Sequence, residues 1–509
     1  MSANNANLYA RFRQRFPADA AAPLLTTPEG EMHTYGDAER ESARFATCLS
    51  GLGLKPGDRV TVQVGKSVEM LWLYLACLRA GLVFHPLNTA YSAAELGYFL
   101  GNAEPGLVVC APDSEAMIKG LAEKLGNIPV LTLGTASDGS LAEAASRAAA
   151  DFDCVASRPD NTAALLYSSG TTGRPKGIML SHRNLASNAE TLVEYWGFTD
   201  RDVLLHALPI FHVHGLFVAI SCALMSGASM RWLPGFNLDA VLAELPHATV
   251  MMGVPTYYTR LLGSETFGKE LCCSMRLFIS GSAPLLAETF LEFEQRTGHR
   301  ILERYGMTET GMNISNPLRG ERRAGTVGLP LPGVSARIVD DSGQPLPPGE
   351  VGNLQVKGPN VFTGYWRMPE KTAEDFTADG FFDTGDKASL SADGYYSIVG
   401  RAKDMVICGG LNVYPKEVEL VIDDIPGIAE SAVIGVPHPD FGEAVVAVVV
   451  PAHADQATLN EDAVIAATRK QLANFKIPKR VIFAAELPRN TMGKVQKNIL
   501  REIHKDLFA

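Results

Sequence analysis

The chain has 509 residues, of which 46 % are hydrophobic, and its formal net charge is −11. This length and apolar content can bury more than one hydrophobic core, which predicts a globular protein of several domains. The acidic balance argues against nucleic acid as a partner, because such a face needs dense basic residues to neutralise phosphates. Small-molecule chemistry is favoured.

Neither the cysteines nor the amino terminus indicates export or membrane insertion. The eight cysteines are scattered, form no C-x-x-C pair and have no histidine at metal-ligand spacing, which is typical of thiols in a reducing compartment. The amino terminus lacks an apolar core of signal-peptide length, and no run reaches the ~18 apolar residues of a membrane span. We therefore expect a cytoplasmic protein without a membrane partner, and an arginine-bearing transit segment is the alternative.

The first half of the chain alternates short β-branched runs with helical patterns, which indicates parallel βαβ units. The strand-like runs are 59–65, 82–87, 106–111, 162–169, 247–254 and 275–281, and the first helix-like runs are 67–81 and 92–104. This α/β pattern predicts a large parallel sheet that helices cover on both faces.

Two further units are expected towards the carboxyl end. Residues 332–358 contain short strands broken by Asp-Ser-Gly and Pro-Pro-Gly turns, which predicts an antiparallel β subdomain. After 400–410 a pattern of alternating helices and strands covers about 105 residues, enough for a small α+β domain. We therefore expect a large amino-terminal domain over 1–402 and a small mobile domain over 403–509.

The stretch YSSGTTGRPKG at 167–177 follows an apolar run and combines glycines, hydroxyls and one lysine. Glycines let backbone N–H groups approach a phosphate closely, and the lysine adds a positive charge. The spacing is not that of the P-loop, because the lysine follows a proline and precedes a glycine. A phosphate-binding loop is the hypothesis, and a polar turn without a ligand is the alternative.

Six segments in order along the chain resemble the signature set of the adenylate-forming superfamily, which includes acyl-CoA synthetases, luciferases and peptide-synthetase adenylation domains. They are YSSGTTGRPKG (167–177), LPIFHVHG (208–215), ERYGMTET (303–310), FFDTGDKA (381–388), GRAKDMVICGGLNVYPKEVE (400–419) and PRNTMGKVQK (488–497). The resemblance implies an enzyme that uses ATP and Mg²⁺ to form an acyl-adenylate and then transfers the acyl group to coenzyme A.

The resemblance also implies roles for single residues. It assigns ATP binding to Ser168, Ser169, Gly170, Thr171, Thr172, Gly173, Lys176, Tyr305, Asp386 and Arg401. Thr308 would touch the α-phosphate, and Glu309 would hold the Mg²⁺, a hard cation that prefers carboxylate and phosphate oxygens. Lys494 would bridge the acyl carboxylate and the α-phosphate in the first half-reaction, for which a flexible point charge is suited.

For the second half-reaction the resemblance implies rotation of the small domain about a hinge at Lys403, followed by attack of the CoA thiol. Gly409 and Gly410 would let the pantetheine arm approach the backbone, although an ordinary tight turn explains these glycines equally well. His212 matches the gate between the acyl pocket and the pantetheine tunnel.

The acid is less legible, because acyl pockets diverge more than nucleotide sites. Arg260, on an expected helix, and Ser282 would suit a second carboxylate, which a guanidinium binds in a bidentate fork. This set resembles malonyl-CoA synthetases and implies malonate, with methylmalonate, as the substrate. A surface ion pair is the alternative for Arg260.

Three other functions stay open at this stage. A medium-chain or aryl-CoA ligase would need a deeper apolar pocket and no Arg260. A peptide-synthetase domain would precede a carrier domain, whereas this sequence stops fifteen residues after Lys494. A non-catalytic nucleotide-binding protein would not need Lys494, whose charge a lysine acetyltransferase could remove in the catalytic case.

Overall fold

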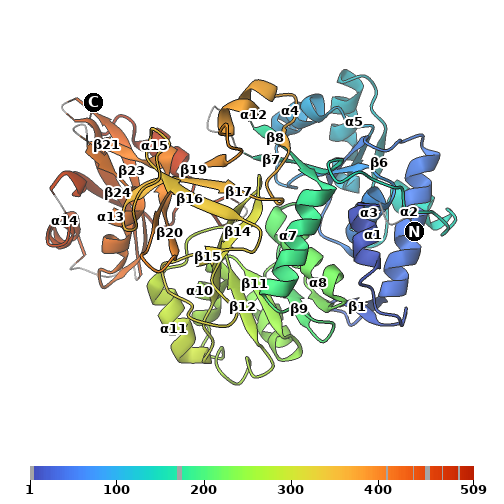
Figure 1. Cartoon of the computed structure of the whole chain (residues 1–509), viewed down its shortest axis with the longest axis horizontal. Helices are drawn as coiled ribbons and strands as arrows, with labels where there is room; N and C mark the ends of the chain where they lie inside the picture. The colour runs from blue at the N-terminus through green and yellow to red at the C-terminus, as the bar shows by residue number, and fades with distance from the viewer. Residues whose placement is uncertain are drawn as a thin grey trace.

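The structure is a computed structural model, and it describes residues 5–168, 175–408, 411–439, 441–452, 459–472, 474–490 and 493–508, without the side chain of Asn412. A large mixed α/β body contains the amino-terminal elements, and the carboxyl-terminal elements form a smaller unit beside it (Figure 1). The α/β class with a separate α+β unit at the carboxyl end, predicted from the sequence, is confirmed.

The first sheet has seven strands, in the order β18-β8-β7-β4-β3-β5-β6. Its members are β3 (Arg59–Gln63), β4 (Val83–Pro86), β5 (Leu107–Cys110), β6 (Val130–Thr132), β7 (Thr162–Ser168), β8 (Lys176–Ser181) and β18 (Gly364–Tyr365). The strands from β7 to β6 pair in parallel, whereas β8 and β18 add antiparallel. The buried parallel strands are almost continuous apolar runs, as expected for a sheet with both faces covered.

The second sheet has nine strands, in the order β15-β14-β13-β12-β11-β9-β10-β1-β2. They are β1 (Pro23–Thr26), β2 (Met32–Thr34), β9 (Val203–His206), β10 (Ser229–Trp232), β11 (Val250–Gly253), β12 (Leu277–Ser280), β13 (Leu302–Met307), β14 (Gly311–Ser315) and β15 (Leu329–Pro330). The single large sheet expected from the sequence is therefore two sheets, because strand periodicity identifies a strand but not the strand it pairs with.

Helices pack on both sheets, as expected. They are α1 (Leu8–Arg13), α2 (Tyr35–Gly51), α3 (Val68–Arg79), α4 (Ala93–Ala103), α5 (Glu115–Lys124), α6 (Ser140–Ser146), α7 (His182–Tyr195), α8 (Ser221–Ser226), α9 (Leu238–Glu244), α10 (Pro255–Leu262), α11 (Ala287–Thr297) and α12 (Pro369–Asp375). A π-helical segment, η2 (His214–Ile220), precedes α8, and short 3₁₀ turns lie at η1 (Pro112–Ser114) and η3 (Leu245–His247). Over the described ranges, no helix has the length and apolar character to cross a membrane.

A four-stranded antiparallel sheet follows, as predicted for this region. Its strands are β16 (Ser335–Val339), β17 (Val351–Lys357), β19 (Phe382–Leu390) and β20 (Tyr396–Arg401). The register places Asp386 of β19 directly opposite Arg401 of β20. Both residues therefore lie where this sheet ends and the carboxyl-terminal unit begins.

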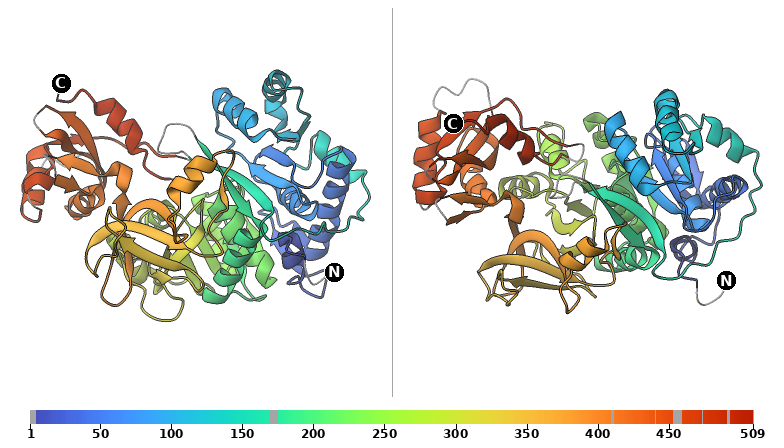
Figure 2. Two further views of the ribbon diagram at one scale, coloured as in Figure 1. Left: turned by 45° about the horizontal axis from the view of Figure 1, so that its top comes forward. Right: turned by 90° about the horizontal axis from the view of Figure 1, so that it is seen from above.

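The carboxyl-terminal unit has its own sheet and its own hydrophobic clusters. Its elements are η4 (Ala402–Asp404), β21 (Val406–Cys408), β22 (Leu411–Val413), α13 (Pro415–Asp423), β23 (Ile428–His438), β24 (Gly442–Pro451), α14 (Glu461–Arg469), η5 (Asn474–Lys476), β25 (Arg480–Phe483) and α15 (Lys497–His504). The view from above shows it at one side of the large body (Figure 2). Only the single turn η4 joins β20 to β21.

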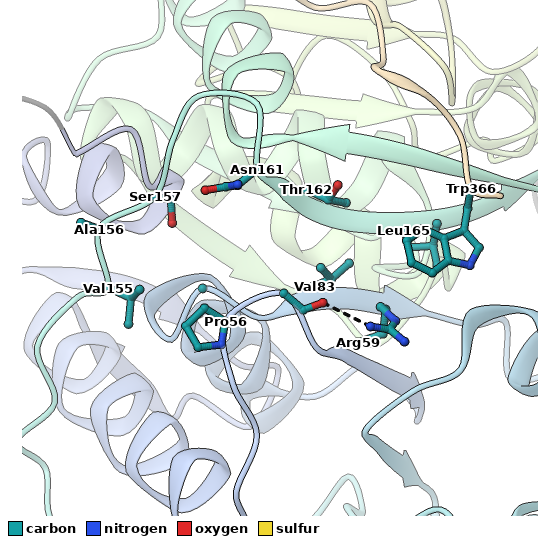
Figure 3. A pocket seen from close by; sticks show the side chains of 12 residues that line it. Pro56, Arg59, Val83, Val155, Ala156, Ser157, Asn161, Thr162, Leu165 and Trp366 are labelled. Atoms are coloured by element: carbon teal, nitrogen blue, oxygen red, sulfur yellow. Dashed lines mark hydrogen bonds between the residues drawn. The ribbon is translucent and has the colours of Figure 1, made fainter. Parts of the chain in front are cut away.

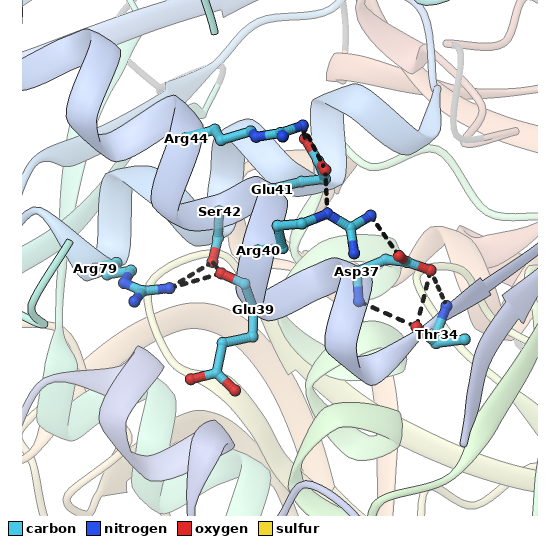
Figure 4. A network of polar contacts seen from close by, with 8 residues as sticks. All are labelled: Thr34, Asp37, Glu39, Arg40, Glu41, Ser42, Arg44 and Arg79. Carbon is cyan, nitrogen blue, oxygen red and sulfur yellow. Dashed lines mark hydrogen bonds and ion pairs between the residues drawn. The ribbon is translucent and has the colours of Figure 1, made fainter. Parts of the chain in front are cut away.

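Arg79, the last residue of α3, connects α3 to α2 by hydrogen bonds (Figure 4). Its guanidinium is 6 % exposed and donates to the Glu39 carbonyl at 2.8 Å, to Ser42 Oγ at 3.2 Å and to the Phe152 carbonyl at 2.7 Å. It also lies 5.0 Å from the centre of the Tyr9 ring. Hydrogen bonds to neutral acceptors thus satisfy this buried cation.

We predict that Arg79→Met lowers the free energy of unfolding by about 2–4 kcal/mol, because buried acceptors lose a charged donor. The midpoint of urea unfolding, followed by circular dichroism, measures the change. Arg40→Met is the control from the same network, since Arg40 pairs with Asp37 and Glu41 on the surface and should change the free energy by at most about 0.5 kcal/mol. Equal losses in both variants would contradict the prediction.

Candidate active site

Three predicted nucleotide ligands meet beside the end of β20. The Tyr305 hydroxyl, on β13, donates a hydrogen bond to Asp386 Oδ2, and Arg401 Nε lies 2.9 Å from Asp386 Oδ1. Asp386 is 4 % exposed. Burial, followed by the charge of Asp386, raises the pKa of Tyr305, so this phenol stays protonated and remains a donor. The aromatic ring can stack on a base, and the carboxylate and guanidinium can form hydrogen bonds with a ribose.

The phosphate side of the site is built on β7 and β8. Ser168 ends β7 and Lys176 begins β8, and the two residues are paired across the strands. The predicted ligands between them, Ser169, Gly170, Thr171, Thr172 and Gly173, lie outside the described residues. The Lys176 ammonium is buried, 3.6 Å from Asp375 Oδ2 and 4.2 Å from the centre of the Tyr365 ring.

Glu309 lies in the turn between β13 and β14, next to the half-buried Thr308. Gly306 and Gly311 close this turn so tightly that a Cβ on Gly306 would lie 2.1 Å from the Gly311 carbonyl oxygen. The Glu309 carboxylate is 6 % exposed and accepts a hydrogen bond of 3.3 Å from Ser168 Oγ. Burial raises the pKa of Glu309, because a buried carboxylate with few positive partners is less stable in its charged form.

These contacts fit the expected Mg²⁺. Within the described ranges, no group of three or more His, Cys, Asp or Glu side chains could form a metal cage. One buried carboxylate beside a phosphate-binding strand suits Mg²⁺, which is commonly held by one or two carboxylates together with substrate phosphates. Glu309 would hold the ion, which would supply positive charge to the phosphates.

Lys494 reaches the same site from the carboxyl-terminal unit. Its backbone N–H donates to Asn490 Oδ1 at 3.0 Å, and the Asn490 N–H donates back to the Lys494 carbonyl at 2.9 Å. The preceding Gly493 has φ +71°, and a Cβ there would lie 3.1 Å from Thr256 Oγ1 on α10. The side chain keeps access to solvent, yet the protein atoms around it, followed by the charge of Arg401, lower its pKa.

A second cationic group, Arg304, lies buried beside these residues on β13. Its guanidinium is 3 % exposed, and Nε and Nη2 have no hydrogen-bond partner in the part of the chain that the structure describes. Gly281 makes room for it, because a Cβ there would lie 2.4 Å from Arg304 Cζ. Burial lowers the pKa of Arg304 to about 10, so it is still charged at neutral pH. A buried cation with free donors is suited to an anionic ligand.

Ser282 and His214 lie at the same place. Ser282 Oγ is 3.2 Å from His214 Nδ1, and Ser282 has φ +72°, a conformation that non-glycine residues rarely adopt and that clusters at functional sites. Burial and the charge of Arg304 lower the pKa of His214, and its Nε2 has no partner among the described residues. A neutral imidazole, a hydroxyl and a guanidinium thus lie close together.

The remaining predicted residues are at the rim or beyond it. Arg260 is exposed near the end of α10, 5.8 Å from the centre of the Phe236 ring, and its expected contact with a substrate carboxylate stays a prediction. His212 is half-buried before η2, and burial lowers its pKa to about 4. Lys403 is exposed in η4. Gly409 and Gly410 lie outside the described residues.

A cavity of about 280 Å³ elsewhere in the large body does not belong to this site (Figure 3). It lies where β3 and β4 begin, between Val83, Leu165 and Trp366. Arg59 in its wall already donates to the carbonyls of Ala103 and Glu104. This cavity therefore offers no free charge to a ligand.

Comparisons with known proteins agree with this geometry. The profile of the family described as AMP-binding enzyme matches residues 10–366, and that of the AMP-binding enzyme C-terminal domain matches 417–494. The chain is 36 % identical to a malonate–CoA ligase of Arabidopsis thaliana, over 98 % of this chain and 90 % of the relative. It is 35 % identical to a feruloyl-CoA synthase of Amycolatopsis sp, over 93 % and 94 %.

The solved structure of ATP-bound MatB from Rhodopseudomonas palustris is 55 % identical to this chain, with a TM-score of 0.97 over 99 % of this chain and all of that one. The apo form of MatB gives a TM-score of 0.85 at the same identity and coverage. Over the whole chain, this structure is thus more similar to the ATP-bound form than to the apo form.

We predict that kcat/KM for ATP falls as the pH is lowered, and that this fall has its midpoint at a pH above the usual pKa of a glutamate. Because burial raises the pKa of Glu309, lowering the pH protonates it earlier than a free glutamate, which titrates near ~4.3. In Glu309→Gln this acidic limb should vanish and the rate at pH 8 should fall about 10²–10³-fold. An acidic limb that survives unchanged in Glu309→Gln would assign it to another group.

Proposed function

The chain belongs to the AMP-binding enzyme family, and on this premise we propose that it joins malonate to coenzyme A in an ATP-dependent reaction with an acyl-adenylate intermediate. The observation that carries the choice of acid is the buried Arg304 guanidinium, whose Nε and Nη2 have no hydrogen-bond partner among the described residues. Methylmalonate carries the same two carboxylates and is a second substrate.

The nucleotide half of the site supports the first half-reaction. One carboxylate of the acid attacks the α-phosphorus of ATP, and pyrophosphate leaves. Asp386, Arg401 and Tyr305 hold the nucleoside, Lys176 and the loop before it hold the phosphates, and Thr308 contacts the α-phosphate. Lys494 stabilises the charge that develops between the carboxylate and the α-phosphate, since a cation fixed beforehand acts most strongly in a site that excludes water.

The distal carboxylate of malonate is assigned to Arg304 and Ser282. A buried guanidinium needs hydrogen-bond acceptors or an opposite charge, and the distal carboxylate of malonate would bring both to Arg304. The hydrogen bond between Ser282 Oγ and the neutral His214 uses one of their two protons, so one of the two groups can donate the other proton to the remaining carboxylate oxygen. Arg260 stays the competing receptor, at the mouth of the pocket.

The alternatives fit these contacts less well. A medium-chain or aryl acid would leave Arg304 buried without a partner, which costs several kcal/mol per uncompensated ion in proteins. A non-catalytic nucleotide-binding protein would not require Lys494 to lie beside Arg401 and Asp386, as it does here.

For thioester formation we propose rotation of the domain 403–509 against the domain 1–402 about Lys403. The single turn η4 between the two supports this, because a few residues can absorb the change in dihedral angles. His212 would then gate the path of the thiol, and Gly409 and Gly410 would line it. Neutral imidazole at His212 suits a gate that must not repel or retain an anionic product.

We also propose the cytoplasm as the location of this enzyme. All eight cysteines are free thiols, which supports a reducing compartment. Fractionation of cells that express the tagged chain would test this, and recovery with a membrane-bounded organelle would contradict it.

We predict that Arg304→Met lowers kcat/KM for malonate at least about 100-fold, equivalent to about 2.7 kcal/mol of transition-state binding. Activity with propionate, which lacks the distal carboxylate, should change less than threefold, because no partner of Arg304 is lost. Arg260→Met is the matched control and should keep the malonate preference. Loss of that preference in Arg260→Met with retention in Arg304→Met would move the receptor to Arg260.

We predict that a lysine acetyltransferase can inactivate the chain through Lys494, since acetylation removes the charge on which adenylation depends. The side chain is exposed enough to be reached. Mass spectrometry should find acetylation at Lys494 that rises as adenylation falls, and a deacetylase should restore the rate. Lost activity with an unmodified Lys494 would refute this regulation.

A further inference from the structure

We propose that Asp375 is the counter-anion of Lys176 when no nucleotide is bound, and that it competes with the phosphates of ATP and pyrophosphate for this lysine. Asp375 would thereby set the affinity of the site for both ligands and favour release of pyrophosphate. The inference rests on the proposed function only where Lys176 is taken as a phosphate ligand.

The first support is the environment of Lys176. Its side chain is 9 % exposed, and an ammonium this deep needs a counter-charge or a polar shell. The Tyr365 ring covers one side at 4.2 Å, and Asp375 Oδ2 lies at 3.6 Å. Among the described residues, Asp375 is the acid within ion-pair distance of Lys176. Glu309 also acts on Lys176 electrostatically, but from beyond that distance.

The second support is that Asp375 stays fixed when Lys176 turns to a ligand. Its other oxygen, Oδ1, lies 2.8 Å from Lys371 Nζ one helical turn earlier on α12. Asp375 therefore keeps one cation after it loses the other. Lys176 can therefore leave Asp375 for a phosphate and return, while Lys371 keeps the Asp375 carboxylate paired.

The third support is the rigid connection between α12 and the phosphate-binding strand. β18, directly before α12, pairs with β8, and the Trp366 N–H donates to the Gly177 carbonyl at 2.7 Å. Thr372 on α12 accepts a hydrogen bond of 2.9 Å from the Tyr365 N–H. Asp375 is thus held at a constant place beside Lys176, as Figure 1 shows for α12 above β7 and β8.

An acid beside an anion-binding lysine has a clear electrostatic effect. Pyrophosphate and the ATP triphosphate need the Lys176 ammonium, and to reach it they must draw it away from Asp375, which attracts the same charge. Removing the carboxylate charge therefore strengthens binding of both ligands, whereas removing a residue that merely supports Lys176 would weaken it. The sign of the change separates the two roles.

The test uses the full chain and isothermal titration with Mg-pyrophosphate and with MgATP, without acid or CoA. Asp375→Asn should lower both dissociation constants at least fivefold. Glu374→Gln is the matched control, because Glu374 is adjacent, carries the same charge and pairs with Lys371 at 3.1 Å but not with Lys176. It should change either constant less than twofold.

A second background tests whether the effect passes through Lys176. In Lys176→Met, the further change Asp375→Asn should alter the dissociation constants less than twofold. Unchanged or weaker binding in Asp375→Asn alone, or an equal gain in both backgrounds, would overturn the proposal. Thermal midpoints of all variants without nucleotide exclude unfolding as the cause. Because no malonate is present, these results stand even if another acid is the substrate.

Discussion

The buried charges of Arg304 and Glu309 impose the constraint on which the rest of this structure depends. They lie on β13 and in the turn that follows it, and within the described ranges neither has an opposite charge at ion-pair distance. Burial of an unpaired ion is costly, so the surrounding fold must hold the space open and the ligands must supply the missing charge. Gly281 and Gly306 serve this purpose, because each gives up a side chain where another group approaches closely. The nine-stranded sheet therefore positions Arg304 and Glu309 but supplies no opposite charge to either within the described ranges.

The nucleotide side of the site was largely legible in the sequence. Tyr305, Asp386 and Arg401 stand in separate motifs, yet the structure brings them into direct contact. Asp386 and Arg401 are opposite each other on neighbouring strands of the four-stranded sheet, and Tyr305 comes from β13 of the nine-stranded sheet, so these residues meet where the two sheets approach each other. The strands and helices whose ranges the sequence predicted also begin and end within a few residues of those limits, because apolar periodicity is a short-range signal.

The acyl-binding residues were harder to predict from the sequence, because their identification depends on which buried polar side chains lack a hydrogen-bond partner. Arg304 stands inside a recognised motif, but a sequence does not tell whether a guanidinium meets an acid, and only the packing against Gly281 makes its isolation visible. Arg260 fulfils the same chemical criterion and lies at the surface. The division into two sheets and the π-helical segment at His214–Ile220 were missed for the same reason, since both are set by contacts between distant segments.

The junction at η4 has a consequence for how such enzymes can be recombined. Arg401 is the last residue of β20 and is anchored to Asp386 in the large body, whereas the hydrophobic clusters of the small unit begin at Val406. The linking turn thus separates two cores that share no strand. A chimera joined within this turn would exchange the whole carboxyl-terminal unit, including Lys494. Tyr305, Asp386, Arg401 and Arg304 would keep their native neighbours in the large body. The residues proposed to bind the acid and the lysine proposed to act in adenylation are therefore encoded on separate parts of the gene.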